Sequence, residues 1–283
     1  MGKNLFAAAV VAALLLGSPP PAEAEKAQGG WTLAQSLGGA INPLAAEYAV
    51  RVFRTRPLFP GRAGRLWESA RIEAGFHNAL TPAYDTFSVF VLVEPAAVFD
   101  LHLSAGVRGY YDLFGFGYTP LAGFDAPFDA STRRNLDRSG EAGFRYSATP
   151  TLKGALGPLL FSHSAGFVLL DMRGADTAED HYFEPVSNAI LARFGGYLSN
   201  DSLLAYDFGG GFLGGLAHSF LFVPASSYVS QKILAVCRVS LPMGERVDFS
   251  AAFLGGVFLR DRYHSYRDGT VHLAAQGGMR VRL

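Results

Sequence analysis

The chain alternates between apolar and polar residues over stretches that are longer than an ordinary strand. In segment 101–113, Leu103 and Val107 share one parity, whereas His102 and Arg108 share the other. Successive side chains of a β-strand point to opposite faces of the sheet, so each parity forms one face. Ordinary strands end after about five or six residues. The alternation therefore predicts a long strand with one apolar face and one polar face.

The same alternation recurs along the chain, separated by links that are short and long in turn. The predicted strands are 44–56, 65–78, 86–94, 98–113, 140–152, 157–172, 184–198, 202–222, 229–241, 246–260 and 270–283. Bacterial barrels have an even number of strands, so the weakly alternating segment 31–41 is the predicted first strand. Short turns are expected at 94–97 and 199–201, and the longest loop at 115–140. The pattern predicts an all-β, transmembrane, antiparallel up-and-down β-barrel of about 12 strands, with ten strands as the alternative.

Composition agrees with a surface on which every second residue meets lipid. Hydrophobic residues make up 49% of the chain and charged residues only 17%, yet no apolar run after the N-terminal segment approaches membrane-helix length. A soluble, secreted all-β sandwich or barrel would also alternate, but strands of this length are rare in such proteins. The 24 basic and 24 acidic residues balance, which does not suggest a nucleic-acid partner.

The N-terminal residues have the order of a secretory signal. Lys3 precedes the apolar run 7–16, and Ala22-Glu23-Ala24 supplies small residues for cleavage. We therefore expect a cleaved signal peptide at 1–24, an N-terminal periplasmic segment with a possible first strand at 25–43, and the β-barrel at 44–283. The single cysteine excludes a disulfide framework.

The last strand ends on an apolar residue at the chain terminus. Gly278, Val281 and Leu283 fit a Gly-x-x-apolar-x-apolar pattern. This ending resembles the C-terminal assembly signal of bacterial outer-membrane β-barrel proteins, in which the last residue is usually Phe rather than Leu. The resemblance implies export to the outer membrane of a diderm bacterium, contact with outer-membrane lipid and insertion by the barrel-assembly machinery. It implies no particular activity.

The polar parity of the predicted strands gives candidate residues for the lumen. The candidates are Arg51, Arg71, Glu73, Arg108, Asp112, Arg145, Arg193, Asp207, Arg238, Asp248, Arg260 and Arg280. Basic residues predominate among them, so a continuous pore should favour anions. A barrel of this size has a narrow lumen, and the same charges could instead form a salt-bridged filler.

These features predict a narrow, porin-like channel or a barrel that binds small, anionic solutes. The alternative is a non-conducting barrel that acts through its outer loops. We expect a monomer because no lipid-facing polar patch stands out in the sequence, and we expect no cofactor. The aromatic residues Tyr110 and Tyr118 flank the longest loop and are expected at the membrane interface.

Enzymatic activity, as an outer-membrane lipid hydrolase, is the least favoured hypothesis. His163-Ser164 and His218-Ser219 are adjacent pairs, and a hydrolase needs a serine next to a base. Neighbouring residues of a strand point to opposite faces, so neither pair can form a hydrogen-bonded dyad. No spacing of His, Cys and Asp matches a metal site.

Overall fold

The computed structural model describes residues 29–42, 45–62, 64, 66–111, 117–126, 138–244, 246–261 and 267–283. The predicted signal peptide and Asp112 lie outside these residues. Twelve strands form the barrel: β1 (Gly30–Ile41), β2 (Ala45–Pro57), β3 (Arg71–Leu80), β4 (Tyr84–Ala96), β5 (Phe99–Tyr110), β7 (Glu141–Leu156), β8 (Leu159–Asp171), β11 (Phe194–Gly209), β12 (Phe212–Val223), β13 (Tyr228–Met243), β14 (Val247–Asp261) and β15 (Val271–Arg282). A separate sheet contains β6 (Thr119–Leu121), β9 (His181–Glu184) and β10 (Ala189–Ala192).

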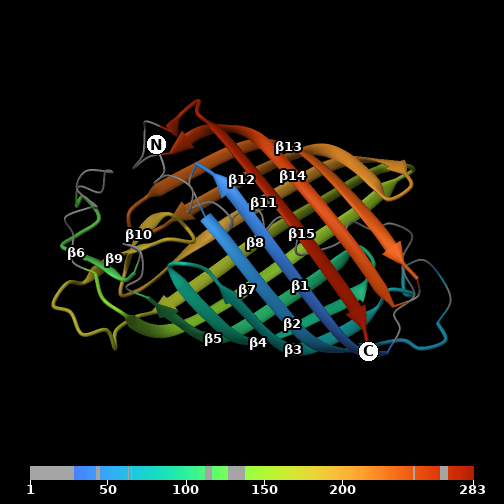
Figure 1. The fold of residues 1–283 in the computed structure, drawn as a ribbon, viewed down its shortest axis with the longest axis horizontal. Coiled ribbons are helices and arrows are strands. Elements are labelled where there is room, and N and C mark those ends of the chain that lie inside the picture. Colours follow the sequence, from blue (N-terminus) through green and yellow to red (C-terminus); the bar gives the residue numbers. More distant parts are fainter. Residues whose placement is uncertain are drawn as a thin grey trace.

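The twelve strands close into one antiparallel barrel, as the alternation predicts (Figure 1). Each strand pairs with its neighbours along the chain, and β1 closes the cylinder by pairing with both β2 and β15. Segment 31–41 is therefore a full barrel strand, and the alternative of ten strands is wrong. In the part of the chain that the structure describes, no helix is long and apolar enough to cross a membrane.

The outer surface of the barrel is apolar because one parity of each strand points outward. Large hydrophobic side chains remain exposed there on strands all around the cylinder, among them Phe76 (52%), Phe87 (53%), Phe144 (54%), Phe161 (51%) and Phe253 (59%). Monomeric soluble proteins rarely expose apolar patches of more than a few hundred Å². A closed barrel also satisfies the backbone hydrogen bonds of every strand within the wall. The surface is that of a barrel surrounded by lipid.

The two ends of the barrel differ in their connections. At one end, which we call the terminus end, β1 begins, β15 finishes and tight turns join β7 to β8 and β11 to β12. At the other end, which we call the cap end, the long segments between β5 and β7 and between β8 and β11 carry the three-stranded sheet. Figure 1 shows this small sheet at the cap end.

Two predicted strands, 184–198 and 202–222, are placed incorrectly by the sequence pattern. The observed strands are β11 and β12, and the predicted turn at 199–201 lies in the middle of β11. The actual turn follows Gly209, where Gly209, Gly210 and Gly211 all have positive φ angles of 81°, 62° and 80°. Glycine adopts this conformation without the strain of a Cβ atom. The first part of the predicted segment 184–198 belongs instead to the three-stranded sheet of β6, β9 and β10, which we call the cap.

Candidate functional site

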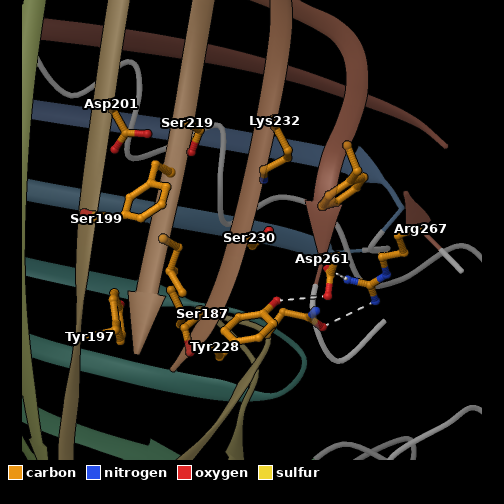
Figure 2. A pocket seen from close by; sticks show the side chains of 15 residues that line it. Ser187, Tyr197, Ser199, Asp201, Ser219, Tyr228, Ser230, Lys232, Asp261 and Arg267 are labelled. Atoms are coloured by element: carbon orange, nitrogen blue, oxygen red, sulfur yellow. Dashed lines mark hydrogen bonds and ion pairs between the residues drawn. The ribbon is translucent and has the colours of Figure 1, made fainter. Parts of the chain in front are cut away.

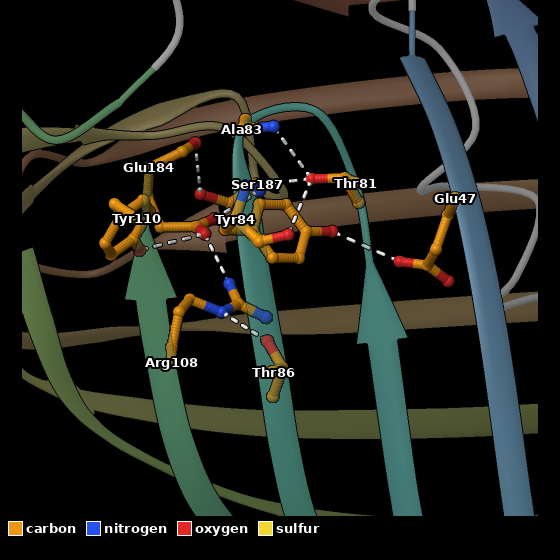
Figure 3. A network of polar contacts seen from close by, with 9 residues as sticks. All are labelled: Glu47, Thr81, Ala83, Tyr84, Thr86, Arg108, Tyr110, Glu184 and Ser187. Carbon is orange, nitrogen blue, oxygen red and sulfur yellow. Dashed lines mark hydrogen bonds and ion pairs between the residues drawn. The ribbon is translucent and has the colours of Figure 1, made fainter. Parts of the chain in front are cut away.

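A buried ion pair fixes the cap inside the mouth of the barrel. Arg108 on β5 donates from Nη1 to Oε1 of Glu184 on β9 at 2.5 Å, and their side chains are only 4% and 0% exposed. The Nε atom of Arg108 donates to Thr86 at 2.9 Å, and the guanidinium lies 4.4 Å from the ring centroid of Tyr84. Figure 3 shows Glu184 reaching Arg108 within this network. The cap is thus joined to the barrel wall by a desolvated, charge-assisted contact.

The second carboxylate oxygen of Glu184 holds the turn that follows β9. It accepts a hydrogen bond from the backbone N–H of Ser187 at 2.6 Å. On the wall, Tyr84 extends the network by donating from its hydroxyl to Glu47 on β2 at 3.2 Å. One carboxylate therefore organises both the turn of the cap and its contact with the wall.

Tyrosine side chains fill the mouth around this ion pair. The rings of Tyr118 and Tyr182 are stacked with their centroids 4.9 Å apart, and Tyr110 meets both edge-on at 5.9 and 6.0 Å. All three side chains are almost completely buried. Burial raises the pKa of the Tyr118 phenol, which lies outside the spanning strands, to about 12. Tyr110, at the end of β5, and Tyr118 therefore point into the mouth, and their predicted position at the membrane interface is wrong.

A small cavity with polar and apolar lining residues lies beneath the cap. It measures about 50 Å³ and is lined by side chains from β11, β12, β13 and β14 and by the turn between β9 and β10. Figure 2 shows Asp201, Ser219 and Lys232 on the strands around it and Ser187 on the cap side. Such a volume holds roughly three to five water molecules.

A series of arginines continues through the lumen away from the cap. Arg51 on β2, Arg145 on β7, Arg238 on β13 and Arg280 on β15 are half-buried and lie on the inward parity of their strands. No carboxylate oxygen of the described residues lies within 4.0 Å of their guanidinium groups. Among the predicted lumen candidates, these four are the arginines that lie on the inward parity of barrel strands and form no ion pair with the described residues.

Like charges nearby influence these arginines electrostatically. Arg280 repels both Arg51 and Arg238, and Arg145 repels Arg108. Glu47 and Glu73 attract Arg51, but neither forms an ion pair with it. Like charges in a confined space of low dielectric constant raise the local concentration of counter-ions. We call Arg51, Arg145, Arg238 and Arg280 the arginine track.

The bonding of Arg145 shows how these side chains are held. Its Nη1 atom donates to the hydroxyls of Ser104 and Ser147 at 3.4 and 3.3 Å. Its Nε atom is buried and has no hydrogen-bond partner among the described residues. A buried donor without a partner costs about 1–3 kcal/mol. An anion or an ordered water molecule at this position would supply the missing acceptor.

A network of paired charges lies between β3, β4, β5 and β7 near the terminus end. Lys153 on β7 contacts Glu94 at 3.2 Å and Asp100 at 2.8 Å, and all three side chains are buried. Arg71 contacts the same Glu94 at 3.2 Å and also Glu73 at 2.8 Å. This network corresponds to the salt-bridged filler that the sequence analysis kept as an alternative. It stiffens one side of the wall and leaves no charge free for a solute.

The buried network makes a prediction about stability. Lys153→Met should lower the free energy of unfolding by about 3–5 kcal/mol, because Asp100 would remain buried without an ion pair and Glu94 would keep only its contact with Arg71. Urea unfolding of the barrel in lipid vesicles, followed by tryptophan fluorescence, measures the change. The control is Asp248→Asn, which removes a partly exposed pair with Arg282 at 3.5 Å and should cost no more than about 1 kcal/mol. Equal effects of the two changes would contradict the assignment.

Two predicted lumen residues lie elsewhere. Arg193 lies between β10 and β11, where its guanidinium donates to backbone carbonyls of Met172, Arg173, Ala175 and Thr177. Arg260 is exposed on the outer face, because the register between β13 and β14 shifts at Gln231/Lys232 and reverses the parity. Both assignments to the lumen are therefore wrong.

The remaining candidates lie near the terminus end. Asp207 accepts a hydrogen bond from the backbone N–H of Gly209 at 2.8 Å and so stabilises the turn between β11 and β12. Asp248 pairs with Arg282. In the structure these two carboxylates support the wall and the turn.

Glu184 and Tyr182 were not predicted as residues of the mouth. Glu184 is the first residue of segment 184–198. The apolar residues that follow it led to the prediction of a barrel strand there. Lys232 lies on the inward parity of β13 but becomes informative only beside the cavity. Among the described residues, no group of His, Cys, Asp and Glu could hold a metal ion.

Comparisons with known proteins find barrels of similar architecture. No family model and no curated protein sequence matches the chain. The NanC porin structure has 9% sequence identity and a TM-score of 0.43, covering 89% of this chain and 100% of that one. The β domain of the Bordetella autotransporter BrkA has 12% identity and a TM-score of 0.43, covering 91% and 100%. An anion-selective porin from Comamonas acidovorans has 9% identity and a TM-score of 0.33, covering 90% and 100%. By its own strand pairing, the chain is a closed, twelve-strand, antiparallel β-barrel.

Proposed function

We propose that the chain is an outer-membrane β-barrel whose lumen binds small anions and lets them pass when the cap moves. The terminus end would face the periplasm and the cap end the exterior, as expected for bacterial barrels with short periplasmic turns. The apolar outer surface supports the membrane location. The anion preference rests on one observation, the arginine track without ion pairs.

Charge and hydration explain why these arginines suit anions. Guanidinium groups in a narrow lumen attract anions and repel cations, and low-dielectric walls strengthen both effects. Their donors also replace part of the water shell of an entering phosphate or carboxylate. Residues that are paired, such as Arg71 and Lys153, supply no such field because carboxylates neutralise them.

The second candidate function is a non-conducting barrel that acts through its outer loops. The specific observation in its favour is the burial of the cap in the mouth, where Glu184, Tyr118 and Tyr182 are completely buried. A permanently seated cap would leave the arginine track open only toward the terminus end. The barrel would then bind periplasmic anions without passing them.

Planar-bilayer recordings distinguish the two candidates. The purified, folded protein is inserted into a bilayer with a tenfold gradient of potassium chloride, and the reversal potential is measured. We expect openings whose reversal potential lies toward the chloride equilibrium potential. Cation-selective openings would contradict the proposal. Absence of openings, with heat-modifiable gel migration confirming a folded barrel, would favour the non-conducting candidate.

A further inference from the structure

Two charged side chains that form no ion pair with the described residues line the cavity beneath the cap. Lys232 on β13 and Asp201 on β11 both lie on the inward parity of their strands. Lys232 is only 6% exposed, and no carboxylate oxygen of the described residues lies within 4.0 Å of its ammonium group. Asp201 attracts Lys232 from a greater distance. The cavity therefore carries one positive and one negative group that do not contact each other.

The register of three neighbouring strands sets these two charges apart. Asp201 is directly opposite Ser219 on β12, and Ser219 is directly opposite Lys232 on β13. Neighbouring strands lie about 4.8 Å apart, so the backbone positions of Asp201 and Lys232 are separated by roughly 10 Å. Figure 2 shows the three side chains at one level of the cavity on adjacent strands. The two charges thus face the same space from separate strands, with a serine hydroxyl between them.

The other two charged residues that line the cavity are paired with each other. Arg267 contacts Asp261 at 3.5 Å, and the hydroxyl of Tyr228 donates to Asp261 at 3.2 Å. All three side chains are almost completely buried. Together Arg267 and Asp261 contribute little net charge, because each neutralises the other. The electrostatic character of the free space is therefore set by Lys232 and Asp201.

The cap contributes the remaining part of the lining. Val186, Ser187 and Asn188, in the turn between β9 and β10, line the cavity together with the strands. Glu184 positions this turn by accepting a hydrogen bond from the backbone N–H of Ser187 at 2.6 Å. The contact between cap and wall at Arg108 therefore also shapes the cavity. Charges interact more strongly in such a desolvated space than they do in water.

We propose that this cavity binds a small zwitterion, an amino acid of the size of glycine. The carboxylate of the ligand lies against the ammonium group of Lys232, and its ammonium group lies against the carboxylate of Asp201. Hydroxyl groups both donate and accept hydrogen bonds, so they can serve either end of such a ligand. Three serines of the wall supply hydroxyls to the lining, namely Ser199, Ser219 and Ser230.

Charge and volume together favour a zwitterion over an ion of one sign. An anion would pair with Lys232 but would be repelled by Asp201, and a cation would meet the reverse, whereas a zwitterion pairs both buried charges. The cavity of about 50 Å³ has room for roughly three to five water molecules, and glycine has no more non-hydrogen atoms than that. None of the residues of the arginine track lines this cavity. The site therefore differs from the track in both its place and the class of its ligand.

Equilibrium dialysis with radiolabelled glycine tests the class of ligand. The purified, folded barrel in detergent micelles is dialysed against glycine, with acetate or ethylamine added as competitor. We expect saturable binding of a single glycine per barrel. Acetate lacks the ammonium group and ethylamine lacks the carboxylate, so each should compete at least about tenfold more weakly than unlabelled glycine. Absence of saturable glycine binding would overturn the proposal, and so would acetate or ethylamine that competes as well as glycine.

Variants locate the site. Asp201→Asn and Lys232→Met should each weaken glycine binding at least about tenfold, because one charge of the ligand would lose its partner. Asp201→Asn should also strengthen the binding of acetate, because the repelling carboxylate is gone. The matched control is Ser164→Ala, since Ser164 lies directly opposite Asp201 on β8 but bonds to Thr151 at 3.0 Å outside the cavity.

Heat-modifiable gel migration confirms that each variant is folded. Ser164→Ala should bind glycine as the unaltered protein does. Glycine binding that is unchanged in folded Asp201→Asn or Lys232→Met would contradict the assignment. If a variant does not fold, the competition by acetate and ethylamine at the unaltered protein still decides the question. None of these outcomes depends on whether the lumen conducts, so this proposal and the proposed passage of anions can fail separately.

Discussion

A barrel carrying Glu184→Ala is expected to conduct severalfold more current than the unaltered protein. The change removes the carboxylate that pairs with Arg108 and accepts from Ser187, so the cap loses its charged contact with the wall. Breaking a buried ion pair costs about 3–5 kcal/mol, which shifts the balance between seated and released cap by a hundredfold or more. Single-channel recording measures the conductance and the fraction of time open.

Two variants control this result. Asp171→Ala breaks an exposed pair with Arg173 at the same end and should leave conductance unchanged. Glu184→Gln keeps the size of the side chain but loses its charge, so its conductance should lie between the two. Unchanged conductance in folded Glu184→Ala would mean that the ion pair does not keep the mouth closed.

The double variant Arg51→Ser/Arg145→Ser should lose most of the preference for anions. These two guanidinium groups lie in the lumen without ion pairs, so their removal weakens the field that a passing ion experiences. The permeability ratio of chloride to potassium should fall at least about threefold, with a larger fall at low ionic strength because salt screens the field less. Reversal potentials in salt gradients measure the ratio.

The matched control for the double variant is Arg260→Ser. The sequence pattern placed Arg260 in the lumen, whereas the structure places it on the outer face. Its replacement should therefore leave the permeability ratio unchanged. A loss of selectivity in Arg260→Ser, or none in the double variant, would contradict the assignment of the arginine track.

Period-two alternation was sufficient to predict the barrel and most of its strands. Each predicted strand from 229 onward matches β13, β14 or β15 closely, because one face meets apolar surroundings and the other the lumen. The weak first strand was predicted from the even strand number alone, and β1 confirms it. Arg51, Arg145, Arg238 and Arg280, predicted for the lumen, lie on the inward parity of their strands.

Pairing between distant parts of the chain could not be predicted. The sequence around Ser199 resembles a turn, but those residues continue β11 because β8 and β12 pair with them on both sides. The bulge between β13 and β14 turns Arg260 outward, and the alternation of apolar and polar residues does not reveal it. His163 and Ser202 come together only through the register of β8 with β11. Because the sequence shows only which residues are adjacent, it suggested the pair His163-Ser164 and not the hydrogen bond between His163 and Ser202.

The residues of the cap could not be predicted from the sequence for a related reason. Residues of the cap, such as Tyr182 and Leu191, are buried as completely as those of a soluble core. Their apolar character matches that of lipid-facing residues, so composition cannot distinguish a plug from a strand. The partnership of Arg108 with Glu184 joins residues that are 76 positions apart.

Cysteine accessibility along β2 is the most direct test of a membrane-spanning barrel with a basic lumen. Single cysteines replace Ala49, Val50, Arg51, Val52 and Phe53 in a Cys237→Ser background, and water-soluble thiol reagents of either charge are applied to the protein in vesicles. We predict reaction at Arg51 and the other odd positions, protection at Val50 and Val52, and faster reaction with the anionic reagent than with the cationic one. Uniform reactivity, reversed parity or a preference for the cationic reagent would contradict the account.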